Sequence, residues 1–130
     1  MKIAIDLDGT ALYHREFFRE FMKAMQDRGH QVGILTSHNV KDKPEDLLML
    51  EALDFPKPDF YIGKTDEEKA ELKPTIGNNG TWKARMVEEH EIDYLFGDLD
   101  KNPNYLKAFR EKFPDRIFYS FTDDKSKQEI

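Results

Sequence analysis

The sequence predicts an α/β fold: a three-layer sandwich in which helices cover both faces of a parallel sheet of five strands. Short apolar segments of strand length alternate along the chain with longer segments whose apolar residues recur at helical spacing. The chain has 130 residues, of which 38% are hydrophobic, enough for one domain with one core. Strands that alternate with helices are joined by crossover connections, so the sheet is expected to be parallel.

The first half of the chain is expected to contain three strands and two helices. The first helix carries Phe18, Met22 and Met25 three or four residues apart, and Gly29 ends it. Pro44 suits the first turn of the second helix, where no backbone N–H is needed. The strands are expected at 2–6, 31–36 and 59–62, and the helices at 15–28 and 44–53.

The second half continues the alternation with two helices and two strands. Thr81 follows Gly80 and can cap the first of these helices, and Asn102 can cap the second. We therefore expect a single domain over 1–130 with a Rossmann-like alternation of strands and helices. The helices are expected at 81–90 and 103–113, the strands at 92–96 and 116–121, and a frayed tail at 122–130.

The segment 63–80 interrupts this pattern. It contains the sequence GNNG, and only 66–72 have the character of a short helix. A connection of this length is usually functional. We therefore expect a binding loop or a small lid over 63–80.

The composition excludes several classes of function. The chain has no cysteine, which excludes disulfides, thiolate zinc sites and cysteine nucleophiles. Its net charge of −6 disfavours general nucleic-acid binding and implies that any phosphate site has its own local cations. No apolar segment approaches the ~20 residues that span a bilayer, and no signal peptide is recognisable, so we expect a cytoplasmic protein without membrane association. A homo-oligomer is compatible with the sequence.

Acidic residues follow two of the predicted strands. Asp6 and Asp8 come at the end of the first strand, and Asp98 follows the strand at 92–96. The carboxyl ends of parallel strands meet at one edge of the sheet, where ligands bind. Residues two apart in an extended chain point to the same side, and Gly9 allows a sharp turn after them. Such oxygen ligands suit Mg²⁺, whereas the alternative is that these aspartates only cap loops and helices.

Two further residues are candidates for contact with a phosphate. Thr36 ends an apolar strand and offers a hydroxyl and a backbone N–H. Lys83 is expected in the first turn of the helix at 81–90, where free N–H groups and the helix dipole favour anions. Taken singly, each is better explained as an ordinary loop or surface residue. Lys73, in the segment ELKPT, is an alternative to Lys83.

These residues occur in segments that resemble the motifs of a known family. IAIDLDGT resembles the first motif of the haloacid dehalogenase-like (HAD) phosphohydrolases, GILTS resembles their second, Lys83 matches their motif lysine, and LFGDLDKN resembles their acidic fourth motif. The order and spacing agree over residues 2–102. The fourth motif often has a second aspartate where this chain has Asn102, and Asp100 is a possible substitute.

The resemblance implies a HAD-like fold and a phosphatase mechanism. Asp6 would attack the phosphorus of a phosphomonoester and form an aspartyl-phosphate, and Asp8 would be the general acid and base. Mg²⁺ would be held by the Asp6 carboxylate, the Asp8 backbone carbonyl and Asp98. Thr36 and Lys83 would hold the transferring phosphoryl group.

The resemblance also bears on the substrate. The segment between the first two motifs and the segment 63–80 are too short for large cap domains, so the chain resembles a capless member of the family. Such members accept large substrates or use a neighbouring subunit as a cap, and which phosphorylated compound is the substrate stays open. His14, Arg15 and His38 flank the expected site, but solvent-facing loops are the better explanation for each.

Three other functions fit parts of the pattern. A non-catalytic module would keep the metal and phosphate site without turnover. A phosphotransferase on the same scaffold usually needs a cap to exclude water. A receiver-type signalling domain has its phosphate-accepting aspartate at the end of the third strand, whereas the third strand of this chain ends in Tyr61-Ile62-Gly63, without an acidic residue.

Overall fold

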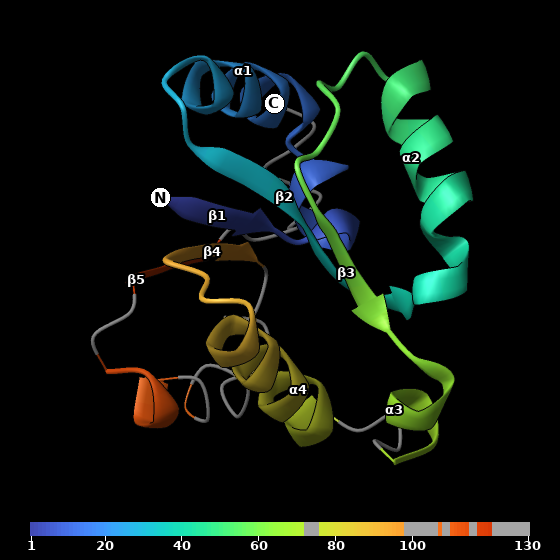
Figure 1. Cartoon of the computed structure of the whole chain (residues 1–130), viewed down its shortest axis with the longest axis vertical. Coiled ribbons are helices and arrows are strands. Elements are labelled where there is room, and N and C mark those ends of the chain that lie inside the picture. The colour runs from blue at the N-terminus through green and yellow to red at the C-terminus, as the bar shows by residue number, and fades with distance from the viewer. Residues whose placement is uncertain (72–75, 98–106, 108–109, 115–116, 121–130) are drawn as a thin grey trace.

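The computed structural model describes residues 1–71, 76–97, 107, 110–114 and 117–120 (Figure 1). Its centre is a parallel sheet in which the strands lie in the order β3-β2-β1-β4-β5. The strands are β1 (Lys2–Ile5), β2 (Gln31–Asn39), β3 (Tyr61–Lys64), β4 (Tyr94–Gly97) and β5 (Ile117–Ser120). The predicted α/β class and parallel sheet are confirmed.

Helices follow the strands, as the alternating pattern predicted. They are α1 (Arg15–Asp27), α2 (Lys43–Ala52), α3 (Asp66–Glu71) and α4 (Ile76–Glu89). A π-helical turn, Leu7–Ala11, follows β1, and a short 3-10 turn, Val40–Asp42, precedes α2. Of the helix expected at 103–113, Lys107 and 110–112 are helical, and the rest lies outside the described residues. The tail expected at 122–130 also lies outside them.

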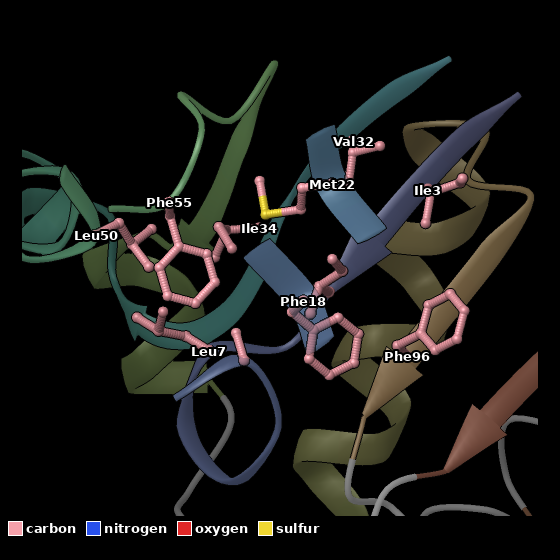
Figure 2. Packing of buried hydrophobic residues seen from close by; sticks show 11 residues of the cluster. Ile3, Leu7, Phe18, Met22, Val32, Ile34, Leu50, Phe55 and Phe96 are labelled. Atoms are coloured by element: carbon pink, nitrogen blue, oxygen red, sulfur yellow. The ribbon is translucent and has the colours of Figure 1, made fainter. Parts of the chain in front are cut away.

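One face of the sheet packs against α1 and α2. Phe18 and Met22 of α1 are one helical turn apart, so both point to the sheet, and both are fully buried. The ring of Phe18 meets the ring of Phe96 of β4 edge to face, with 5.8 Å between the ring centroids. Figure 2 shows the cluster, which also contains buried residues of β1, β2, α2 and the segment after α2: Ile3, Ile5, Val32, Ile34, Leu50 and Phe55.

The other face of the sheet packs against α4. Trp82 is the largest fully buried side chain of this second cluster, and Val87 of the same helix also belongs to it. They meet Ala4, Leu35 and Leu95 of the three central strands. Ala4 faces α4 while its neighbours in β1 face α1, as the alternation of side chains along a strand requires. The central strands are thus buried on both faces, which explains why they are almost purely apolar.

Several boundaries differ from the predictions, and the strand expected at 31–36 continues to Asn39. The helix expected at 81–90 begins at Ile76, so Thr81 is inside the helix and is not its N-cap. The GNNG sequence, expected in a loop, therefore lies in the first part of α4. Glycine and asparagine are poor helix formers, but packing of the later turns against the sheet outweighs that weak preference. The third strand, expected at 59–62, runs from Tyr61 to Lys64.

Strands β2 and β3 pair irregularly near their carboxyl ends. Leu35 pairs with Ile62, but the next pair is Asn39 with Lys64, so β2 has more residues than β3 between the two pairs. The extra residues form a bulge that contains Thr36 and His38. A Cβ atom on Gly63 would lie 2.9 Å from the backbone oxygen of His38, so glycine allows β3 to approach this bulge closely. Bulges of this kind redirect side chains at the edge of a sheet.

Candidate active site at the carboxyl edge of the sheet

The strand order locates a natural binding position between β1 and β4. From β1 the chain first adds β2 and β3 on one side and then returns to add β4 and β5 on the other. Ligands of open parallel sheets bind at this reversal, beyond the carboxyl ends of the strands. Asp6 follows β1 directly, and its backbone N–H donates to the carbonyl of Phe96 in β4 over 2.8 Å. Asp6 therefore lies at the reversal point.

Asp6 forms a buried ion pair with Lys83 of α4. The Lys83 Nζ lies 3.0 Å from Oδ2 of Asp6, and both residues are only 6% exposed. The other carboxylate oxygen, Oδ1, accepts a 2.9 Å hydrogen bond from the backbone N–H of Leu7. Charged side chains are rarely buried to this extent, because burial costs more hydration energy than a pair usually returns. A buried pair at a ligand-binding edge is therefore better explained by function than by stability.

The structure brings Lys83, a predicted phosphate contact, next to Asp6, but Lys83 is not at the helix start where the sequence analysis expected it. Lys83 was expected in the first turn of its helix, where the helix dipole attracts anions. It lies in the middle of α4 instead. Its position comes from packing, because the neighbouring Trp82 and Ala84 are buried and hold this part of the helix against the sheet. The competing lysine, Lys73, lies outside the described residues.

The turn after β1 separates the two aspartates of the first motif. Gly9 has a φ of 75°, the left-handed conformation that glycine adopts without strain, as expected from the sequence. The N–H of Ala11 donates to the carbonyl of Asp6, and the N–H of Leu12 donates to that of Leu7, both over 3.1 Å. Asp8 consequently lies at the rim of the site, with 65% of its side chain exposed. One aspartate is thus buried and the other meets solvent.

Thr36 and His38 reach the same edge from the bulge of β2. Thr36 is almost fully buried, and its Oγ1 accepts a 3.2 Å hydrogen bond from the backbone N–H of His38. This contact orients the hydroxyl at the end of the strand next to β1, where the sequence predicted a phosphate contact.

His38 connects Asp8 to two residues that the sequence analysis did not identify. Its Nε2 contacts Oδ2 of Asp8, and its Nδ1 lies 2.9 Å from Oδ2 of Asp46 in α2. The hydroxyl of Tyr61 in β3 donates to the same oxygen of Asp46. Partial burial alone would lower the pKa of His38, but the hydrogen bonds to Asp46 and Asp8 and their negative charges outweigh it and raise this pKa. Burial and the bond to Asp46 raise the pKa of the Tyr61 hydroxyl.

A second buried lysine lies near this edge. Lys64 ends β3 and is 5% exposed, and its Nζ lies 5.2 Å from the ring centroid of Trp82. Burial lowers the pKa of Lys64, and the positive charges of Lys69 and Lys83 lower it further. Lys64, Lys69 and Lys83 thus place positive charges near one another in a protein that is acidic as a whole. The sequence signal that could have identified Lys64 is its position just after the predicted end of an apolar strand.

An open hollow lies beside Asp8. It has a volume of about 450 Å³ and is lined by Gly9, Leu12, Tyr13 and Arg15 in addition to Asp8. Tyr13 is 40% exposed, and Arg15 donates from Nε to the carbonyl of Leu12 over 2.9 Å. The hollow is large enough for part of a substrate next to the proposed acid and base.

Of the expected magnesium ligands, Asp6 and Asp8 lie within the described residues. Asp6 and the Asp8 backbone carbonyl provide oxygen donors at the strand end, which is the chemistry that Mg²⁺ prefers. Asp98, Asp100 and Asn102 lie outside the described residues. Within the described ranges, no group of three or more histidine or acidic side chains is arranged to hold a metal ion.

Comparisons of the chain with protein-family models, with characterised proteins and with solved structures found no match. Among the helices of the described part of the chain, none is long and apolar enough to cross a membrane.

Proposed function

We propose that the protein is a magnesium-dependent phosphatase of the HAD type, with a Rossmann-like five-stranded sandwich, that hydrolyses a phosphomonoester through an aspartyl-phosphate on Asp6. The observation that carries the proposal is the buried Asp6–Lys83 pair at the reversal point of the sheet. The DLDGT sequence supports it, since the first aspartate of that sequence forms the pair.

In this proposal Asp6 is the nucleophile. The Leu7 N–H and the Lys83 ammonium hold its two carboxylate oxygens before substrate binds, so little reorganisation precedes attack. An oxygen of Asp6 attacks phosphorus in line while the ester oxygen departs. Lys83 and the Thr36 hydroxyl then neutralise and orient the equatorial phosphoryl oxygens. Mg²⁺, held by Asp6, the Asp8 carbonyl and Asp98, would reduce the charge repulsion between the carboxylate and the phosphate.

Asp8 is the proposed general acid and base. In the first step it gives a proton to the departing ester oxygen, and in the second it takes a proton from the water that attacks the aspartyl-phosphate. The exposure of Asp8 and the open hollow beside it favour water as the acceptor. They argue against a phosphotransferase, which must exclude water during the reaction.

A phosphatase assay tests the proposal. Wild-type protein is incubated with p-nitrophenyl phosphate and with a panel of phosphorylated metabolites, nucleotides and phosphopeptides in the presence of Mg²⁺. We expect turnover that the isosteric variant Asp6→Asn abolishes. Wild-type protein that binds phosphate but turns over no ester would instead identify a non-catalytic binding module.

A further inference from the structure

We propose that His38 is a positioning residue for Asp8, and that Asp46 and Tyr61 hold His38 in place. The inference rests on the proposed function, because it concerns how the proposed acid and base is oriented. It adds three residues to the site, and it assigns a role to a histidine that sequence reasoning explained as a solvent-facing loop residue.

The contacts form a continuous chain across the sheet edge. Tyr61 of β3 donates to Asp46 of α2, Asp46 contacts Nδ1 of His38 in β2, and Nε2 of His38 contacts Asp8 after β1. Each link therefore joins two different elements of the fold. Because Asp46 also receives the Tyr61 hydroxyl, its carboxylate is fixed from two sides and can orient the imidazole ring.

Exposure increases steadily along this chain. The side chain of Asp46 is 11% exposed, that of His38 is 29% exposed, and that of Asp8 is 65% exposed. The anchor is thus inside the protein and the supported carboxylate is at the solvent rim. Without support, a side chain so exposed would sample several rotamers, whereas proton transfer requires a defined position relative to the leaving group.

The backbone is shaped to place His38 there. The bulge between the Leu35 and Asn39 pairs brings Thr36 and His38 to the site together. Gly63 permits β3 to lie against the backbone of His38, where a Cβ atom would come too close. The contact from His38 engages Oδ2 of Asp8, so Oδ1 is the oxygen that can exchange a proton with the leaving group.

The test compares leaving groups rather than rates alone. A poor leaving group, as in phenyl phosphate, needs the acid in the first step, whereas p-nitrophenolate departs without a proton. A general acid typically contributes ~10²–10⁴-fold to a rate. We expect His38→Ala to lower the single-turnover rate of phosphoenzyme formation from phenyl phosphate by about tenfold to a hundredfold, because part of that contribution is lost. The same rate for p-nitrophenyl phosphate is expected to fall far less.

Additional variants separate positioning from a structural role. His38→Gln keeps a donor toward Asp8 and is expected to recover part of the lost rate. Tyr61→Phe removes only a hydroxyl and is expected to reduce the phenyl phosphate rate by a few-fold. It should have no further effect in a His38→Ala background, because the two residues act through one chain. His30→Ala is the matched control, since His30 contacts the N-terminal amine at the opposite end of the sheet.

The outcomes distinguish this inference from the proposed function. Wild-type protein without turnover contradicts the proposed phosphatase. An active wild type in which His38→Ala leaves the single-turnover rates of phosphoenzyme formation unchanged, raises them, or lowers them equally for both esters overturns the positioning role alone. If His38→Ala does not fold, as judged by circular dichroism, Tyr61→Phe and His38→Gln decide by the same leaving-group comparison.

Discussion

The Asp6–Lys83 pair predicts a particular pattern of stability changes. Two unit charges 3.0 Å apart attract each other by roughly 5–6 kcal/mol at an effective dielectric constant of about 20. Most of that attraction offsets the hydration that both groups lose on burial. Removing one partner leaves the other charge buried and uncompensated, so Lys83→Met should lower the free energy of unfolding by about 3–5 kcal/mol.

Removing both charges should restore most of this loss. In Asp6→Asn/Lys83→Met neither member of the pair leaves an uncompensated charge, and replacements of whole buried pairs are often neutral or stabilising. We therefore expect the free energy of unfolding of the double variant to be within about 2 kcal/mol of the wild-type value. Lys83→Ala should also lower turnover by about a hundredfold, the usual loss for one electrostatic stabiliser, whereas Lys73→Ala should not.

Urea unfolding followed by circular dichroism measures these differences. Lys41→Met is the matched control, because Lys41 pairs with Asp66 at the surface and its loss should leave stability unchanged. Additive effects of Asp6→Asn and Lys83→Met, or a Lys83→Met variant as stable as the wild type, would refute the idea that the two charges compensate each other inside the protein.

Three further predictions follow from the site and the sheet. With p-nitrophenyl phosphate, Asp8→Asn should release one burst of p-nitrophenolate and stall as phosphoenzyme, whereas Asp6→Asn should give no burst. Intact-mass measurement after rapid quenching detects the added phosphoryl group. A stalled Asp8→Asn protein without added mass would contradict the two-step route. Chelation should abolish turnover, Mg²⁺ should restore it and Ca²⁺ should not, since looser coordination misplaces the nucleophile; full activity in excess chelator would exclude the metal. Gly33→Ala should lower the free energy of unfolding by about 1–3 kcal/mol, because the added Cβ would lie 2.4 Å from the backbone oxygen of Phe60. Urea unfolding measures this difference. Unchanged stability would show that Phe60 and the adjoining strand β3 can move away.

Local sequence patterns predicted the helices and strands better than they predicted the contacts between them. The apolar strands and the Phe–Met stripe of α1 carry their signal within a few residues, so they were identified with small errors at the ends. The start of α4 was missed because GNNG has weak helix propensity, and only packing of the later turns reveals the helix. Propensity is a weak guide wherever tertiary contacts decide.

The candidate site was predictable where one motif contains the chemistry. Asp6, Asp8 and Gly9 lie within four residues, so the sequence alone places them together after β1, although the turn there separates the two carboxylates. The support of Asp8 depends on a bulge in β2 and on a helix and a strand far away in sequence, which no local pattern specifies. The sequence does contain one sign that Asp46 belongs to the site. Asp46 is four residues before the buried Leu50, so it lies on the apolar face of α2. An acidic residue in that position requires a buried partner.

The central position of β1 has a consequence for how this protein can change over evolutionary time. Asp6 is tied to a strand with neighbours on both sides, so substitutions that move it would disturb the whole sheet. Tyr13 and Arg15 line the hollow from the end of the turn and the first residue of α1, outside the sheet. If the proposed function holds, changes there can alter which ester is accepted while the nucleophile keeps its place. In that case the chemical step and the choice of substrate depend on different parts of the chain.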